Sequence, residues 1–199
     1  MYEADGIRVK PTLAVLAGLD GLTRLANGLT VAQQLLALSE GPAFISTNCP
    51  EWFEHFDVPL VADVVSNRGA AGGVVTALAF ATTDWVQVVS CQRPFVTRAV
   101  LKQLWAHRHA NTDAICLSLG GELEPLVGLY RRELVYDWEP RLEGAPTLIS
   151  LIESCRVDEV RWSGEELRRL NSPRGLRSAD ESFSNAWSVG TVPSQVAPW

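Results

Sequence analysis

Short runs of apolar residues alternate along the chain with longer stretches in which apolar residues recur at helical spacing. The runs consist mainly of valine, leucine, isoleucine and alanine, which is typical of strands buried on both faces. The predicted strands are Thr12–Ala17, Ala43–Thr47, Leu60–Ala62, Trp85–Ser90, Ala114–Leu119, Leu126–Tyr130 and Val157–Trp162. The predicted helices are Leu29–Leu38, Ala71–Ala81, Arg98–His109 (with Thr97 as its N-cap), Thr147–Cys155 and Gly164–Leu170. This alternation predicts an α/β fold with a mostly parallel sheet covered by helices on both faces.

The length and composition suit one compact domain, because the chain has 199 residues of which 47% are hydrophobic and 20% charged. From Ser178 the composition changes to serine, alanine, proline and valine without periodicity. We therefore expect a domain at residues 1–177 and a flexible tail at residues 178–199. Trp187 and Trp199 in this tail either anchor a protein partner or are incidental.

The formal net charge of −6 leaves no basic face that could neutralise the phosphates of a polynucleotide. We expect no nucleic-acid partner, although backbone amides and a few arginines can still bind a small anionic ligand. No apolar run approaches a membrane span, and the N-terminal residues lack the features of a signal peptide. The four cysteines contain no C-x-x-C pair, so we expect reduced thiols, no zinc site and a cytoplasmic protein.

Polar segments follow four of the predicted strands. They are Gly18–Gly28, Asn48–Glu51, Asp63–Gly73 and Cys91–Phe95. Ligands of parallel sheets bind outside the carboxyl ends of the strands, so the sequence predicts a ligand site formed by these segments. The segment Gly18–Gly28 either wraps backbone amides around a phosphate or is an ordinary strand-to-helix turn.

Two side chains in these segments suit the recognition of a nucleoside. Asn48 offers a paired donor and acceptor to the edge of a base, or else bonds its own backbone in a turn. Asp63 either faces a ligand as an acceptor or caps a loop. The residues by themselves leave both alternatives open.

In this order and at these intervals, the segments resemble the MobA family of molybdenum-cofactor guanylyltransferases. The family pattern runs from L-A-G-G-x-S-x-R-M-G through S-x-N-x-P-E, a strand ending in Asp, G-P-L-x-G, C-D-x-P-F and P-L-x-A-L-Y to N-x-P. The matching fragments are Leu16–Gly18, Ser46–Glu51, Asp63, Cys91–Phe95, Pro125–Tyr130 and Asn171–Pro173. The resemblance spans roughly residues 11–176 and implies a three-layer α/β/α fold of the nucleotide-diphospho-sugar transferase type.

The resemblance also implies roles for individual residues. The backbone of Leu16, Ala17 and Gly18 would hold a guanine nucleotide, and Asn48 and Asp63 would help recognise its nucleoside. The implied cofactor is GTP, and the implied ligands are a guanine nucleotide or a molybdopterin-type molecule.

The chain departs from the family where the family does its chemistry. Gln92 stands at the position of the aspartate that holds Mg²⁺, and no lysine occurs between Lys10 and Lys102 to neutralise the phosphates. Leu19 replaces the second glycine of the first motif. We therefore expect weak or absent Mg²⁺ binding and no intact catalytic residue. The leading hypothesis is a degenerate nucleotidyltransferase, a pseudoenzyme of molybdenum-cofactor metabolism that binds guanine nucleotide or cofactor without efficient catalysis.

Two further residue types keep alternatives open. Arg93 is either a phosphate contact that replaces the metal's charge or an exposed arginine before a proline. Glu122 or Glu124 would hold the metal in a divergent but active molybdopterin nucleotidyltransferase. A third alternative is a non-catalytic interaction or scaffold module.

His107 and His109 lie two residues apart on a predicted helix, so they cannot share a metal.

Overall fold

The computed structural model describes residues 10–94 and 96–162. Phe95, the predicted helix Gly164–Leu170, the motif Asn171–Pro173 and the predicted tail at residues 178–199 lie outside the described residues. The predicted boundary between a domain at residues 1–177 and this tail therefore stays a prediction.

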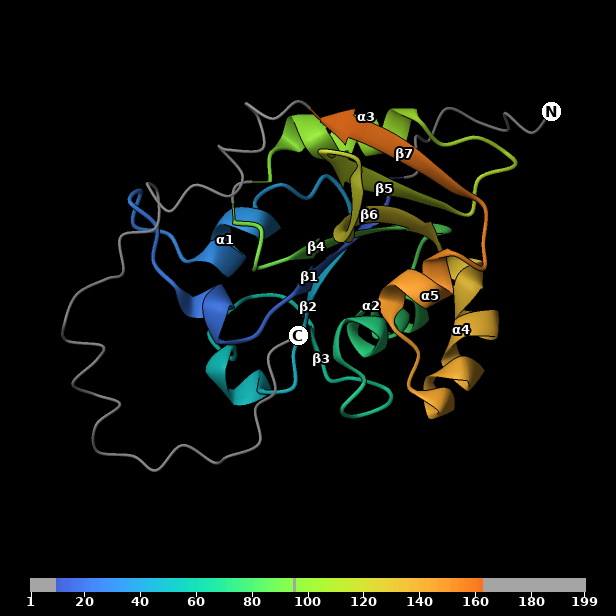
Figure 1. The fold of residues 1–199 in the computed structure, drawn as a ribbon. Coiled ribbons are helices and arrows are strands. Elements are labelled where there is room, and N and C mark those ends of the chain that lie inside the picture. The colour runs from blue at the N-terminus through green and yellow to red at the C-terminus, as the bar shows by residue number, and fades with distance from the viewer. Residues whose placement is uncertain (1–9, 95, 163–199) are drawn as a thin grey trace.

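The centre of the molecule is a seven-stranded sheet in the order β3-β2-β1-β4-β6-β5-β7 (Figure 1). Its strands are β1 Thr12–Leu16, β2 Ala43–Ser46, β3 Leu60–Val61, β4 Trp85–Ser90, β5 Ala114–Leu119, β6 Glu122–Arg131 and β7 Val157–Trp162. Only β6 runs antiparallel to its neighbours β4 and β5. The chain reverses direction between β5 and β6 within two residues, Gly120 and Gly121. Their positive φ values of 64° and 95° make this tight turn possible. The predicted mostly parallel sheet is confirmed.

The helices form a layer on each face of the sheet (Figure 1). They are α1 Val31–Leu36, α2 Gly69–Phe80, α3 Arg98–Ala106, α4 Val135–Arg141 and α5 Leu148–Ile152, with short 3₁₀ helices η1 Leu19–Leu22, η2 Pro50–Trp52, η3 Arg132–Leu134 and η4 Leu142–Gly144. Helices α1 and α3 cover one face, and α2, α4 and α5 cover the other. The predicted three-layer α/β/α architecture is therefore confirmed.

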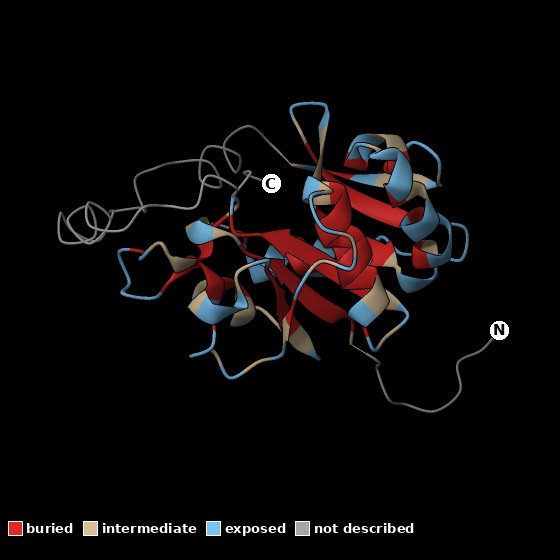
Figure 2. Cartoon of the chain, turned by 90° about the horizontal axis from the view of Figure 1, so that it is seen from below, coloured by how far each residue is buried: buried red, intermediate tan, exposed pale blue. Residues whose placement is uncertain are grey.

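The alternation of side chains along the strands divides the core into two parts. Leu13 and Val15 of β1 pack towards α1 and α3, whereas Ala14 and Leu16 pack towards α2. Figure 2 shows the resulting buried residues concentrated in the sheet and in α2. Because both faces are covered, the strands β1, β2, β4 and β5 are mostly apolar, as the continuous runs in the sequence indicate, whereas the edge strand β7 is polar and only partly buried.

The helix α4 and its neighbourhood were not predicted. The helix has only seven residues and contains Pro140, which leaves too few positions for a helical period to be recognised. It buries Trp138, whose ring meets that of Tyr130 edge to face at a centroid distance of 6.0 Å. The predicted helices 29–38, 71–81, 98–109 and 147–155 begin and end within three residues of α1, α2, α3 and α5. Thr97 caps α3 by accepting a hydrogen bond from the Val100 N–H.

Within residues 10–94 and 96–162, no helix is long and apolar enough to cross a membrane.

Candidate functional site

The four neighbouring strands β3, β2, β1 and β4 run parallel, so the segments that follow them meet at one edge of the sheet. This edge carries the residues that the sequence singled out: Leu16, Ala17, Gly18, Asn48, Asp63, Gln92 and Arg93. We call this region the carboxyl edge. The predicted placement of these residues at one edge is what the structure shows; their roles in binding stay predictions.

Asn48 and Asp63 hold each other across the carboxyl edge. The Asn48 Nδ2 donates to Asp63 Oδ2 at 2.9 Å, and the Asp63 backbone N–H donates to Asn48 Oδ1 at 3.2 Å. The other carboxylate oxygen, Oδ1 of Asp63, is buried and has no hydrogen-bond partner among the described residues. Burial raises the pKa of Asp63, and the hydrogen bond from Asn48 opposes that rise. An amide and an incompletely paired carboxylate are therefore fixed side by side.

The backbone after β1 is largely engaged within the protein. The Cys91 N–H donates to the Leu16 carbonyl at 2.9 Å, and the Ala17 N–H donates to the Ser46 carbonyl at 2.9 Å. The Gly18 N–H donates to Oδ1 of Asp20 at 3.0 Å. The amides of Ala17 and Gly18, which the resemblance assigns to nucleotide binding, are thus used by a neighbouring strand and by a side chain.

Asp20 is a residue that the sequence analysis missed. Burial raises the pKa of its carboxyl group, and the backbone N–H groups of Gly18, Asp20 and Gly21 oppose that rise. Its charge also helps to raise the pKa of the buried Cys91 thiol, so the carboxylate lies close to the end of β4. An aspartate two residues after a strand-end glycine is typical of a turn closed by its own side chain, and this signal was available in the sequence.

Arg93 is paired with Glu124 of β6. The Arg93 Nε donates to Glu124 Oε2 at 2.8 Å, and its Nη2 contacts the same oxygen. The two side chains are only 29% and 12% exposed. A phosphate at Arg93 would have to compete with this carboxylate, and a metal at Glu124 would have to displace this guanidinium. The Arg93–Glu124 ion pair therefore opposes both a phosphate contact at Arg93 and a metal site at Glu124.

The oxygen ligands at the carboxyl edge that could hold Mg²⁺ are mostly engaged by the protein itself. The ion prefers oxygen ligands in near-octahedral geometry, usually with one or two carboxylates. Gln92 is exposed and neutral, Glu124 is committed to Arg93, and Asp20 accepts the Gly18 amide. No group of three or more histidine, cysteine, aspartate or glutamate residues in the described part of the chain could hold a metal ion.

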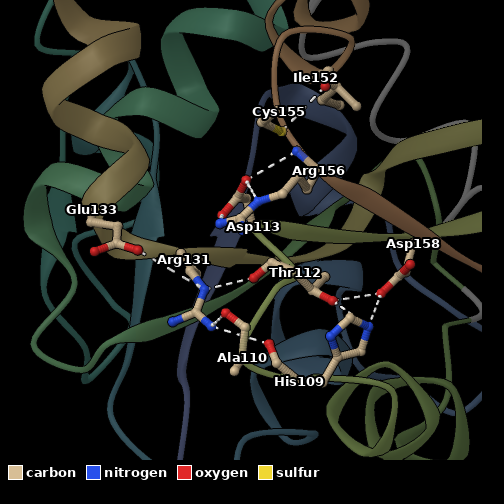
Figure 3. Close-up of polar contacts among 10 residues, drawn as sticks. All are labelled: His109, Ala110, Thr112, Asp113, Arg131, Glu133, Ile152, Cys155, Arg156 and Asp158. Carbon is tan, nitrogen blue, oxygen red and sulfur yellow. Dashed lines mark hydrogen bonds and ion pairs between the residues drawn. The ribbon is translucent and has the colours of Figure 1, made fainter.

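The thiols and imidazoles add no chemistry at this edge. The four cysteines form no disulfide in this structure, and burial raises the pKa of Cys91 and of Cys116, the latter to about 12. His109 lies at the opposite end of the sheet, where its Nε2 is 2.7 Å from Oδ2 of Asp158 (Figure 3). Neither group is placed to activate a nucleophile at the carboxyl edge.

Residues 19–160 match the family model described as the MobA-like NTP transferase domain. The chain belongs to this family. The family model ends before the motif Asn171–Pro173 and confirms the resemblance inferred from the fragments before it.

Curated relatives carry the name of the same enzyme. The chain is 28% identical over 134 residues to a "Probable molybdenum cofactor guanylyltransferase" of Peptoclostridium acidaminophilum, covering 64% of this chain and 60% of that protein. It is 26% identical over 163 residues to the "Molybdenum cofactor guanylyltransferase" of Vibrio atlanticus, covering 78% and 84%. The chain spans 60%, 57% and 54% of the lengths of three such relatives.

Solved structures share the fold. The molybdopterin-guanine dinucleotide biosynthesis protein A of Archaeoglobus fulgidus superposes with a TM-score of 0.65 at 18% identity, covering 89% of this chain and 97% of that one. The 2-C-methyl-D-erythritol 4-phosphate cytidylyltransferase of Thermus thermophilus superposes with a TM-score of 0.59 at 14% identity, covering 83% of this chain and 99% of that one. The fold is therefore that of the nucleotide-diphospho-sugar transferases, as expected.

Proposed function

We propose that this protein is a MobA-like pseudoenzyme of molybdenum-cofactor metabolism. It binds a guanine nucleotide, such as GTP, or a molybdopterin-type ligand at the carboxyl edge, without efficient nucleotidyl transfer. The observation that carries the proposal is the Arg93–Glu124 ion pair beside Gln92, at the point where the family places its metal aspartate.

The nucleoside half of the proposed site supports binding. Asn48 is exposed, and its hydrogen bonds with Asp63 fix both side chains before a ligand arrives. A preorganised amide–carboxylate pair can offer acceptors to the N–H groups of a guanine edge at little entropic cost. The relatives' names, which specify guanylyl transfer, agree with a guanine nucleotide as the ligand.

The phosphate half of the proposed site opposes catalysis. Charge that develops on a transferring phosphoryl group needs cations or a metal for stabilisation. At this edge the Arg93 charge is neutralised by Glu124, and the Asp20 carboxylate adds a negative charge next to the Gly18 amide. Without cations to stabilise the phosphoryl group, we expect nucleotidyl transfer to be slower by several orders of magnitude. Each factor of ten in rate corresponds to about 1.4 kcal/mol of barrier.

The proposal is tested by calorimetric titration of the full chain with GTP, with and without Mg²⁺, and by an assay of pyrophosphate release with molybdopterin and GTP or CTP. We expect GTP binding that hardly changes with Mg²⁺, and no pyrophosphate release above background. Asp63→Asn should abolish GTP binding, whereas the control Asp57→Asn, which changes an exposed acid elsewhere, should not. Strongly Mg²⁺-dependent binding with pyrophosphate release would overturn the proposal.

A divergent but active nucleotidyltransferase is the second candidate, and Asp20 is the observation in its favour. A Mg²⁺ ion that is bound mainly by substrate phosphates needs only one or two protein carboxylates, and Asp20 lies close to Cys91 at the end of β4. If pyrophosphate is released and Asp20→Asn or Glu124→Gln abolishes the release, this candidate replaces the first. If no nucleotide or molybdopterin shifts the melting temperature, the interaction-module alternative replaces both.

A further inference from the structure

A shallow hollow with a cavity volume of about 40 Å³ lies at the other end of the sheet, under α3. It is lined by Lys10, Pro11, Leu38, Glu40, Gln87, Arg98, Leu101, Lys102 and Trp105. Lys10 precedes β1 and Gln87 lies near the start of β4, so the hollow is separate from the carboxyl edge. Its volume is far below that of drug-sized ligand sites, so it suits a small polar group rather than a larger molecule.

The hollow gathers positive charge in an acidic protein. The chain has a net charge of −6 and only two lysines, and both of them line this hollow. Together with Arg98 they surround a single acid: Glu40 lies 2.6 Å from Lys10 Nζ, 3.4 Å from Lys102 Nζ and 3.9 Å from Arg98 Nη1. Among residues 10–94 and 96–162, three cations surround one carboxylate here, which leaves two positive charges without a counterion from this part of the chain.

The inner wall carries a buried polar group that opens into the hollow. Gln87 is only 7% exposed, and its Nε2 donates to the Leu101 carbonyl at 2.9 Å. This bond fixes the amide, and its Oε1 is not one of the fully buried unpaired atoms, so it is open at the wall of the hollow. An amide oxygen in this position can accept a hydrogen bond from a ligand.

The remaining walls are held in place. Trp105 is fixed by Arg108, whose guanidinium carbon lies 3.6 Å from the centroid of its ring. Gly41 allows the turn before β2 to approach Lys10, because an added Cβ there would lie 2.8 Å from Lys10 Cβ. The site therefore does not depend on freely moving lysines alone.

We propose that this hollow binds a phosphate group, carried by free phosphate or by a small phosphomonoester. A phosphate of charge −1.5 to −2 matches the two uncompensated cations. Arg98 and Lys102, which lie farther from Glu40 than Lys10 does, contact its oxygens, while Oε1 of Gln87 accepts a hydrogen bond from a P–O–H or a ligand hydroxyl.

Nuclear magnetic resonance of the ¹⁵N-labelled full chain tests the proposal, with inorganic phosphate and glycerol phosphate as the two probes. We expect saturable shifts of the Gln87 side-chain amide and the Trp105 indole, with a dissociation constant on the order of 1 mM. Tighter binding of glycerol phosphate would assign the ligand as a phosphomonoester, and tighter binding of inorganic phosphate would assign it as the free ion.

Two matched charge reversals distinguish binding in this hollow from a general electrostatic attraction of phosphate to the protein. Lys102→Glu should weaken binding about tenfold or more, whereas Arg132→Glu, an exposed change of the same charge elsewhere, should leave it within about twofold. Gln87→Met, which keeps the volume of the side chain, should weaken binding without unfolding the domain. Shifts that do not saturate by about 50 mM, equal effects of the two reversals, or shifts confined to Gly18–Leu22 would overturn the proposal.

Discussion

The two ends of the sheet use polar side chains in different ways. At the amino ends of β5 and β7, the charged side chains make several hydrogen bonds and ion pairs within the protein. Arg131 donates from Nε to the Thr112 carbonyl at 2.6 Å and from Nη2 to the carbonyls of His109 and Ala110 at 3.1 Å (Figure 3). Asp113 binds the guanidinium of Arg156 with both oxygens, at 2.6 and 2.8 Å.

At the carboxyl edge the polar groups are less completely paired. Five buried side-chain atoms of the described residues have no hydrogen-bond partner, and four of them belong to residues at or after the carboxyl ends of β2, β3 and β5: Ser46, Asp63, Arg68 and Ser118. The fifth belongs to Trp138 in α4. Unpaired buried polar groups cost stability and cluster where a protein meets a ligand. The polar groups at the amino ends of β5 and β7 are therefore closely paired, whereas the carboxyl edge keeps buried polar atoms that the described residues do not pair.

The largest expected effect is at the amino end, with Arg131→Met. This change leaves three carbonyls without their donor and removes the stacking of the guanidinium on Trp85, 4.6 Å from the ring centroid. We expect the free energy of unfolding to fall by about 2–3 kcal/mol in urea denaturation. Arg132→Met, at an exposed neighbour, should change it by less than about 0.5 kcal/mol. A loss of GTP binding in a folded Arg131→Met protein would contradict the division between the two ends.

The Arg93–Glu124 pair is the strongest ion pair at the carboxyl edge. A double-mutant cycle with Arg93→Met and Glu124→Gln should give a coupling energy of about 1–2 kcal/mol, because both side chains are mostly buried. Glu124→Gln alone should also tighten the binding of GTP, since it frees the guanidinium of Arg93 for phosphate. Unchanged or weaker GTP binding in Glu124→Gln would show that Arg93 does not face the ligand.

A smaller and pH-dependent loss is expected for Asp113→Asn. The guanidinium of Arg156 holds the pKa of Asp113 below its usual range, so the ionised form stabilises the folded state. That contribution is complete above the unfolded pKa of about 3.9 and is lost as the pH falls through the lower folded pKa. Urea denaturation at neutral pH should therefore show a less stable variant. A difference that persists at the lowest pH would mean that lost packing causes it.

The smallest effect, of opposite sign, is expected for Asp20→Asn. Burial raises the pKa of Asp20, so ionisation of this group costs stability at neutral pH. The variant keeps an oxygen for the Gly18 N–H and should be slightly more stable than the wild type at pH 7. This gain should shrink as the pH falls through the raised pKa towards about 3.9, where both proteins carry a neutral side chain. A loss of stability at pH 7 would show that hydrogen bonds to the carboxylate outweigh its burial.

The sequence by itself determined the layers of the fold and the family. The bounds of β4, β5 and β7 coincide with the predicted runs. For β4 and β5 this is because continuous apolar stretches report burial on both faces of a sheet, whereas β7 is a polar and partly exposed edge strand. The same patterns located Asn48 and Asp63 after the strands at which they meet. The bounds of a strand and the polar residue that follows it are local information, since they lie within a few positions of each other in the sequence.

Only the tertiary structure decided how the charged residues are paired. Arg93 and Glu124 lie 31 residues apart and meet because β6 runs antiparallel next to β4, a reversal that the apolar run of β6 does not reveal. The lysines at positions 10 and 102 gather around Glu40 because the segment before β1, the segment before β2 and helix α3 meet there. Side-chain electrostatics depends on distances between such segments, and the order of strands in the sheet, which the periodicity does not encode, sets those distances.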